Sequence, residues 1–289
     1  WECPDLFELP IDGDPSHPAW VFKIDTNRGL AAARPEAWVF TGTFDGGAFA
    51  DGGLGPRNVD SGPDFYAAQS WSNAPGGRRT WIAWMDHWSY ALITPTEAWR
   101  GALTIPRDVR LASRDGVPVV VQSPVDLSPI DLGVLARGTG LVVAGDDDLG
   151  GAVRGAPLDV TVRLAPGAWS RAGLRLFTGT DGSAAKVGYD RGTGEVFVDR
   201  DDAVGPGVDR LFAGRFAAAC APGPDGRVSL RVLVDASSVE VFAGDAAITA
   251  LVFADPASDG LGLFAEGGAA TFESVEVRAL APIRPAPTP

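Results

Sequence analysis

The chain has 289 residues, of which 45% are hydrophobic and 21% are charged, values that are ordinary for a globular protein of one or two domains. Its formal net charge of −13 argues against nucleic acid and anionic membrane surfaces as partners, because both are bound through clustered Lys and Arg. No apolar run approaches the roughly 20 residues that a membrane-spanning helix needs.

The first part of the chain is a series of short strand candidates separated by loops. Its glycines and prolines are spread without a period and favour turns over long helices. Strands are predicted where β-branched and aromatic residues gather, at Trp20–Ile24, Ala37–Thr43, Phe65–Ser70, Thr80–Met85 and Tyr90–Thr94. This spacing predicts a β-propeller or a sandwich. The pattern changes between residues 108 and 118, and we assign the first domain to residues 1–110.

Residues 111–281 are predicted to form an antiparallel β-sandwich. Apolar and polar residues alternate in Val228–Val234, and the alternation resumes in Val239–Phe242 after a turn at Asp235–Ser238, which predicts a hairpin with one buried face. A second hairpin is expected between Val187–Asp190 and Glu195–Asp199. Further strands are predicted at residues 103–113, 117–122, 158–164, 174–177, 248–253, 260–264 and 270–277. The proline-rich tail, residues 282–289, is expected to be disordered.

The stretch Asp60–Gly101 is rich in aromatic side chains and holds five of the nine tryptophans. Within it, the carboxylates Asp60 and Asp64 stand close to Phe65 and Tyr66. Aromatic faces and hydrogen-bonding carboxylates together suit a pocket for a small polyhydroxy ligand. A tryptophan-rich core is the alternative interpretation, because aromatic side chains usually serve packing.

Several other kinds of site find little support in the sequence. No Gly-x-Ser-x-Gly motif accompanies the two histidines, and a Walker loop and a dinucleotide fingerprint are absent, so we predict no cofactor. Two cysteines and two histidines argue against structural zinc, and the acidic run Asp146–Asp148 lacks EF-hand spacing, so we predict no metal. Cys3 and Cys220 are expected to be free buried thiols, with a disulfide between them as the alternative.

Glu2 is a candidate general acid. Hydrolysis of a glycoside uses two carboxyl groups, of which one protonates the leaving oxygen and the other attacks the anomeric carbon or activates water. Glu2 lies between Trp1 and Cys3, whose apolar surfaces favour the protonated form of a carboxyl group. A glutamate beside a tryptophan is usually incidental, so the local sequence alone does not decide the role.

A series of motifs along the whole chain carries more information. It opens with Trp1-Glu2-Cys3-Pro4-Asp5 and continues through Phe44–Gly46, Asp60–Trp71, Gly77–Arg79, Trp84–Ala91, Pro95–Gly101 and Ile105–Arg107. Leu233–Phe242 follows in the second half. In this order the motifs resemble those of glycoside hydrolase family 32, the β-fructofuranosidases, which include invertases, inulinases and levanases. The first motif is similar to the acid/base motif of the family, and the last to a signature of its C-terminal sandwich.

The resemblance implies an all-β protein with the last blades of a five-bladed β-propeller followed by a β-sandwich. It also implies a retaining enzyme, secreted from the cell, that releases terminal fructose from levan, inulin or sucrose, although the chain shows no signal peptide. Glu2 would be the general acid/base, and Trp88 would help to form the wall of the fructose subsite. The remaining residues that the resemblance places at or near the substrate are Trp1, Asp60, Asp64 and Tyr66.

One part of the family pattern is missing from the chain. The nucleophile of the family is an Asp in a Trp-Met-Asn-Asp-Pro-Asn-Gly motif, and an Asp in an Arg-Asp-Pro motif stabilises the transition state. Neither motif occurs here, and both precede the acid/base motif in the family, so we expect a C-terminal fragment that is inactive by itself. The alternatives are a non-catalytic fructan-binding module with surface aromatics such as Trp169, and a fructosyltransferase. The preferred substrate and the oligomeric state stay open.

Overall fold

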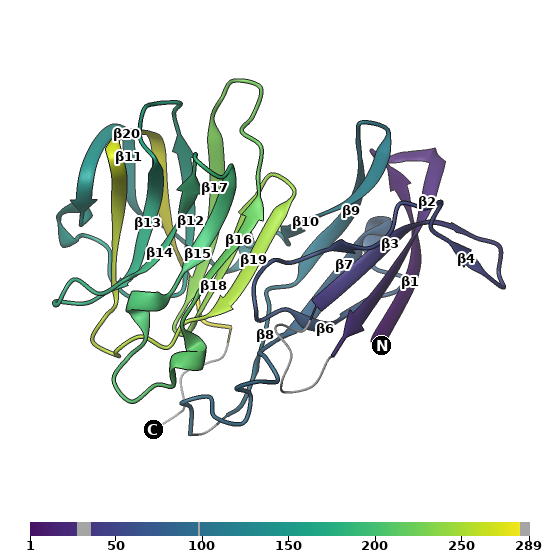
Figure 1. The fold of residues 1–289 in the computed structure, drawn as a ribbon, viewed down its shortest axis with the longest axis horizontal. Helices are drawn as coiled ribbons and strands as arrows, with labels where there is room; N and C mark the ends of the chain where they lie inside the picture. Colours follow the sequence, from purple (N-terminus) through teal and green to yellow (C-terminus); the bar gives the residue numbers. More distant parts are fainter. Residues whose placement is uncertain (28–35, 98, 284–289) are drawn as a thin grey trace. The chain divides into compact units, whose positions relative to one another are not determined.

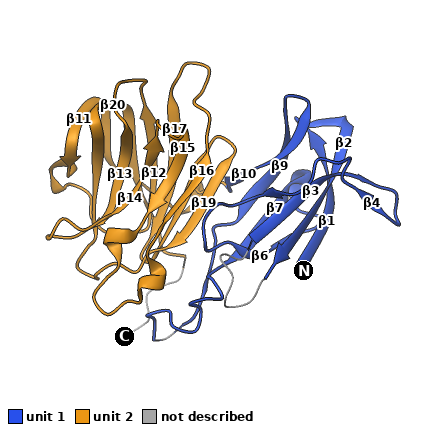
Figure 2. Ribbon diagram, viewed as in Figure 1, with its two compact units in different colours: residues 1–125 blue, residues 126–289 orange. Residues whose placement is uncertain are grey.

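The computed structural model describes residues 1–27, 36–97 and 99–283 (Figure 1). The chain folds into two compact units, Trp1–Val125 and Asp126–Pro289, and each is built on a β-sheet (Figure 2). The all-β prediction is therefore confirmed. Within the described residues, no helix has the length and apolar character to cross a membrane.

The sheet of unit 1 consists of two antiparallel groups of strands. One group is β1–β2–β3 with β4 and β5 on β3, and the other is β6–β7–β9–β10 with β8 on β7. The groups meet where Ile11 of β1 pairs in parallel with Leu111 of β9. Each group resembles one blade of a β-propeller. The elements are β1 (Glu2–Ile11), β2 (Asp14–Thr26), β3 (Glu36–Phe44), β4 (Phe49–Ala50), β5 (Arg57–Asn58), β6 (Tyr66–Ser70), the 3-10 turn η1 (Pro75–Gly77), β7 (Arg79–Met85), β8 (Ala102–Leu103), β9 (Arg107–Arg114) and β10 (Val117–Pro124).

Side chains that alternate along these strands fill the core of unit 1. Because successive residues of a strand point to opposite faces, Phe7 and Leu9 of β1 share the buried face with Val21 of β2. Trp81 of β7, whose side chain has no exposed surface, lies in the same cluster with Leu111. The two groups of strands therefore share one hydrophobic core.

Unit 2 is one continuous ten-stranded sheet with the strand order β16-β15-β14-β13-β20-β12-β17-β18-β19 and with β11 on β20. Neighbouring strands in it are antiparallel. The elements are η2 (Ser128–Ile130), β11 (Asp131–Asp147), η3 (Leu149–Gly151), β12 (Leu158–Leu164), β13 (Arg171–Thr178), β14 (Ala185–Asp190), β15 (Glu195–Asp199), η4 (Asp201–Ala203), η5 (Arg210–Phe212), β16 (Arg215–Ala219), β17 (Val228–Asp235), β18 (Ser238–Ala243), β19 (Ala246–Leu251) and β20 (Gly260–Leu280).

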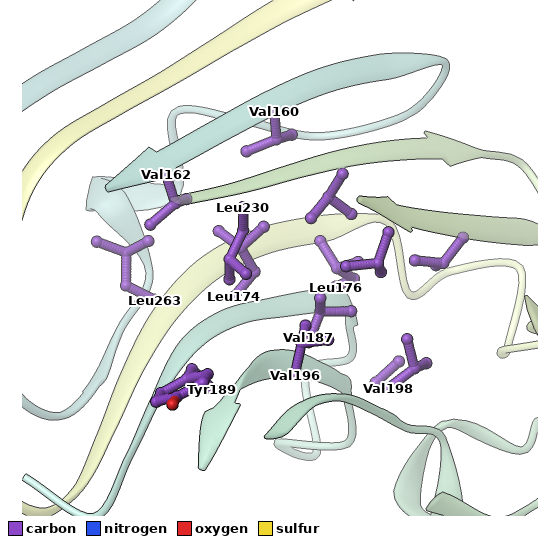
Figure 3. Close-up of a cluster of buried hydrophobic side chains, with 14 of the residues drawn as sticks. Val160, Val162, Leu174, Leu176, Val187, Tyr189, Val196, Val198, Leu230 and Leu263 are labelled. Carbon is purple, nitrogen blue, oxygen red and sulfur yellow. The ribbon is translucent and has the colours of Figure 1, made fainter. Parts of the chain in front are cut away.

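The long strand β20 joins the two halves of this sheet. Its first part pairs with β13 from Gly260 to Glu266, and its second part pairs with β12 from Phe272 to Ala279. Between these parts Gly267 and Gly268 have φ of +67° and +140°, a conformation that glycine adopts without strain. The strand thus passes from one half of the sheet to the other, and inward-facing side chains of both halves, such as Val162, Leu174 and Val187, form the buried cluster of Figure 3.

Both hairpins predicted in unit 2 are confirmed. Asp235 pairs with Ser238 and leaves a two-residue turn between β17 and β18, while Asp190 pairs with Glu195 at the end of the β14–β15 hairpin. The segments predicted as separate strands at 260–264 and 270–277 are two parts of β20. Strand β11 was not predicted, because its sequence, DLGVLARGTGLVVAGDD, interrupts the apolar alternation with glycines.

The structure corrects three expectations. Tyr90–Thr94 is not a strand, because the amides of Tyr90 and Ala91 donate to the carbonyl of His87 and close turns. Trp169 is not a surface aromatic: it is 3% exposed and its Nε1 donates to the carbonyl of Ala165 at 3.3 Å. Both cysteines are free, and Cys220 is buried, but Cys3 keeps part of its surface exposed.

The units divide between Val125 and Asp126, whereas the sequence placed the boundary after residue 110. The physical reason is β10, which pairs with β9 along its whole length and so stays with unit 1. The proline-rich tail predicted at residues 282–289 lies outside the described residues from residue 284 onward.

Candidate active site

A hydrogen bond between Glu2 and Tyr66 brings together two predicted site residues that lie 64 positions apart. Glu2 is at the start of β1 and Tyr66 at the start of β6, and the Tyr66 hydroxyl donates to Oε2 of Glu2. Glu2 is exposed, whereas Tyr66 retains only 2% of its surface. Burial, reinforced by the Glu2 carboxylate, raises the pKa of Tyr66 far above its ordinary value, so the phenol keeps its proton and acts as a donor. The exposed Glu2 carboxyl group is thus held in place by a hydrogen bond from the buried Tyr66 hydroxyl.

A row of aromatic rings extends from this hydrogen bond. The ring of Tyr66 meets Trp84 of β7 edge-on at a centroid distance of 6.3 Å, and Trp84 meets Trp88 at 4.8 Å. Trp88 lies just after β7 and is 41% exposed. The row therefore runs from the interior to a tryptophan that is open to solvent. Such a surface is suited to the apolar face of a sugar ring. Trp1 precedes Glu2 in the chain and is 79% exposed.

A buried ion pair lies on the strand next to Glu2. Glu2 and Asp25 of β2 are Cα partners in the β1–β2 ladder, and the ammonium group of Lys23 donates to Asp25. Both side chains are fully buried. Burial raises the pKa of Asp25 to about 6, an effect that the Lys23 charge opposes and the Glu2 charge reinforces. Burial also lowers the pKa of Lys23.

The predicted carboxylates Asp60 and Asp64 lie inside unit 1. Asp60 accepts a hydrogen bond from the Arg107 guanidinium at 2.9 Å, and both of these side chains are fully buried. Its other oxygen accepts the amide of Gly62 at 2.8 Å. Asp64, also buried, accepts from the hydroxyl of Tyr90. Asp60 thus connects the segment before β6 to β9, and Asp64 connects it to the turns after β7, while the part of both carboxylates in substrate binding stays a prediction.

A fourth buried carboxylate, Asp86, lies at the start of the loop that contains Trp88. Asp86 has no exposed surface, and its Oδ1 accepts the amide of His87 at 2.8 Å, while its Oδ2 has no partner among the described residues. Burial, with a smaller contribution from the charge of Asp64, raises the pKa of Asp86 to about 6. Further along the loop the Arg100 guanidinium donates to the carbonyls of Thr94 and Thr96. No cluster of three or more His, Cys, Asp or Glu residues that could hold a metal ion occurs in the described parts of the chain.

The model of the glycosyl hydrolases family 32 N-terminal domain matches residues 1–124, and that of the family 32 C-terminal domain matches residues 138–279. The chain belongs to glycosyl hydrolase family 32.

Curated relatives of this family 32 chain include a levanase and exo-inulinases. A levanase of Bacillus subtilis (strain 168) is 37% identical over 97% of this chain and 42% of its own length. An extracellular exo-inulinase, inuE, of Aspergillus niger is 30% identical over 96% of this chain and 54% of its own length. The chain thus spans about half or less of the length of these relatives.

Solved structures of the family share the fold. The crystal structure of an exo-inulinase from Aspergillus awamori has a TM-score of 0.88 and 27% identity, covering 97% of this chain and 57% of that one. A β-fructofuranosidase from Schwanniomyces occidentalis has a TM-score of 0.81 and 22% identity, covering 97% of this chain and 60% of that one. The predicted fold class, the last part of a propeller followed by a sandwich, is confirmed.

Within this family 32 chain, sequence reasoning overlooked three residues next to Glu2 and Tyr66. These are Lys23, Asp25 and Trp84, all on regular strands. The available signal was the alternation of β2, which places Lys23 and Asp25 on the same face as the buried Val21. Of the carboxyl groups described above, Glu2 alone is exposed, and its role as a general acid/base stays a prediction.

Proposed function

We propose that the protein that carries this chain hydrolyses terminal β-fructofuranosides of levan, inulin or sucrose with retention of configuration, and that Glu2 is its general acid/base. The observation that carries the proposal is the exposed Glu2 carboxyl group, held by the buried Tyr66 hydroxyl at the end of an aromatic row. The names of the related levanase and exo-inulinases support the class of substrate.

In the first step, protonated Glu2 gives its proton to the glycosidic oxygen as the bond from that oxygen to the anomeric carbon breaks. The bonding electron pair leaves with the oxygen, and a second carboxylate forms the covalent fructosyl-enzyme. In the second step, the Glu2 carboxylate takes a proton from water, whose oxygen attacks the anomeric carbon while the bond from that carbon to the second carboxylate breaks. Fructose is released, the second carboxylate regains its electron pair, and Glu2 is protonated again. The 289 residues lack the motif that carries the second carboxylate in the family, so the proposal assigns to this chain only the acid/base half of the reaction.

Trp88 is proposed to form part of the wall against which the fructose ring lies. Its exposed ring ends the aromatic row that begins at Tyr66, and the Tyr66 hydroxyl holds Glu2, so the row connects the proposed wall with the proposed acid/base. Levan, inulin and sucrose all present a terminal β-fructofuranosyl group, and this shared unit is what such a wall would recognise.

The test is the substitution Glu2→Ala in the protein that carries this chain, with β-fructofuranosyl fluoride and sucrose as substrates. Loss of the acid/base should lower kcat on sucrose by about 10²–10⁴-fold. With the fluoride, added azide should restore turnover and yield β-fructofuranosyl azide, because azide attacks the fructosyl-enzyme without needing a base. Glu8→Ala is the matched control, since Glu8 is also an exposed glutamate of β1. Near-normal sucrose hydrolysis by Glu2→Ala would reject the assignment.

We also propose that the protein acts outside the cell. Support comes from relatives whose names describe them as extracellular exo-inulinases. The measurement is the distribution of fructosidase activity between culture medium and washed cells of a strain that expresses the natural gene. Activity confined to the cell interior would contradict the proposal.

A further inference from the structure

Two β-bulges flank the hydrogen bond between Glu2 and Tyr66. The β1–β2 register shifts between Glu2 and Asp5, and the β6–β7 register shifts between Tyr66 and Gln69. In each bulge the residue directly after the site residue has positive φ, +50° at Cys3 and +53° at Ala67. A bulge bends its strand and changes the direction of the neighbouring side chains. The directions of Glu2 and Tyr66 therefore depend on two irregular pieces of backbone, each of which places a non-glycine residue in a sparsely populated conformation.

The ammonium group of Lys23 connects these two bulges. Its Nζ donates to the carbonyl of Ala68 at 2.8 Å and to the carbonyl of Cys3 at 3.3 Å. The third donor goes to Asp25, so all three hydrogens of the ammonium have acceptors, on three different strands. The amide Nε2 of Gln69 donates to the same two carbonyls, at 3.1 Å to Cys3 and 3.0 Å to Ala68. One carbonyl from each bulge is thus shared by two donors.

Stability does not account for a lysine in this place. Lys23 and Asp25 are both fully buried, and the desolvation of such a pair commonly offsets its attraction, so the ion pair by itself contributes little to the stability of the fold. What apolar residues cannot supply is the set of donors that fixes the Cys3 and Ala68 carbonyls relative to each other.

We propose that Lys23 is a positioning residue for general acid catalysis: by joining the bulges after Glu2 and Tyr66, it keeps the Glu2 carboxyl group on the Tyr66 hydroxyl and aimed at the leaving oxygen. Asp25 is the counter-ion that allows the ammonium to remain charged in the interior. This inference rests on the proposed function, because it assigns Lys23 a role in the step in which Glu2 acts.

Lys23→Met, which keeps the length of the side chain and removes its donors, tests the inference in the protein that carries this chain. Two substrates separate positioning from general damage. The sugar alkoxide released from sucrose needs a proton from Glu2, whereas fluoride leaves from β-fructofuranosyl fluoride with far less need of one. A displaced acid should lower kcat/KM for sucrose by about 10²-fold and leave kcat/KM for the fluoride nearly unchanged. An equal loss on both substrates would overturn the inference.

Three further variants separate a loss of positioning from a loss of stability. Gln69→Met removes the second, exposed donor to the Cys3 and Ala68 carbonyls. It should lower the ratio of kcat/KM for sucrose to kcat/KM for the fluoride, by a smaller factor than Lys23→Met does. If Lys23→Met does not fold, Gln69→Met tests whether joining the two bulges positions Glu2. Thr80→Val is the control and should leave the ratio unchanged. It removes a partly buried cross-strand hydrogen bond of 2.6 Å, from Thr80 to Asp108, which involves neither bulge. In a Glu2→Ala background, Lys23→Met should cause no additional loss on sucrose.

The two proposals fail in distinguishable ways. If the unmodified protein cleaves neither sucrose nor the fluoride, the proposed function is wrong. If it cleaves both, and neither Lys23→Met nor Gln69→Met changes the ratio of the two rates, the role of Lys23 alone is wrong.

Discussion

Replacing Asp86 with Asn should change how the stability of unit 1 depends on pH. Asp86 is fully buried; Oδ1 accepts the His87 amide, and Oδ2 has no partner among the described residues. Asparagine has nearly the same shape and can keep the acceptor at Oδ1, but it carries no charge at any pH. The substitution therefore removes the titration of this site with little change in packing.

The magnitude follows from the pKa of about 6 that burial gives Asp86, against an ordinary value of 3.8. Between these two values the folded protein binds a proton that the unfolded chain has released, so the free energy of unfolding falls as the pH rises. Each pKa unit corresponds to about 1.4 kcal/mol, which gives a loss of about 3 kcal/mol between the acidic and the neutral limit. Asp86→Asn has no such titration and does not undergo this loss. The free energy of unfolding of the variant, minus that of the unmodified chain, should therefore increase by about 3 kcal/mol between pH about 3.5 and pH about 7.

Urea unfolding followed by tryptophan fluorescence is the appropriate assay, because eight of the nine tryptophans lie in unit 1. Asp25 also has a raised pKa and titrates in both proteins, so only the difference between the two proteins isolates Asp86. The new amide changes the hydrogen bonding by the same amount at every pH and cancels from the pH dependence. A stability difference that stays constant between acidic and neutral pH would refute the reasoning.

Three further substitutions test other parts of the structure. Arg107→Met leaves the buried Asp60 without its ion-pair partner and should cost unit 1 about 3–5 kcal/mol, and adding Asp60→Asn should recover part of this loss in urea unfolding. Gly101→Ala would place a Cβ 2.5 Å from Nε1 of Trp84 at a φ of +68°, so we expect a loss of about 1–3 kcal/mol and an altered tryptophan emission spectrum. Leu174→Ala creates a cavity in unit 2 and should lower its free energy of unfolding by about 2–5 kcal/mol, measured by far-ultraviolet circular dichroism. An equal shift in the unfolding of unit 1, followed by tryptophan fluorescence, would contradict the separation of the two cores.

The fold and part of the site could be predicted because they depend on local patterns. Alternation in Val228–Val234 specified a strand with one buried face, and a short turn specified the hairpin that follows it. Glu2 was predicted as the acid/base from a contiguous motif, and this role stays a prediction. The ring of Trp88 is exposed, and its role as a wall of the fructose subsite stays a prediction.

The remaining features depend on contacts between distant segments. The face of β2 that contains Lys23 and Asp25 is recognisable from alternation, but its burial and its acceptors come from β1 and β6, up to 45 residues away. Tyr90–Thr94 has the composition of a strand. However, the amides of Tyr90 and Ala91 donate to the carbonyl of His87, so this segment forms turns. The pairing of Asp60 with Arg107, which buries both side chains, joins residues that are 47 positions apart and is not visible in either local sequence.

Strand β20 has a consequence for the order of events during synthesis. It occupies residues 260–280, after every other strand described in unit 2, and it lies between β13 and β12 at the centre of the sheet. A nascent chain leaves the ribosome from its N-terminus, so β11–β19 emerge before the strand that joins their two halves. Unit 1 can complete its own sheet during translation, but the apolar faces of unit 2 stay uncovered until β20 is released. We therefore expect this interval to be when the nascent protein depends most on chaperones.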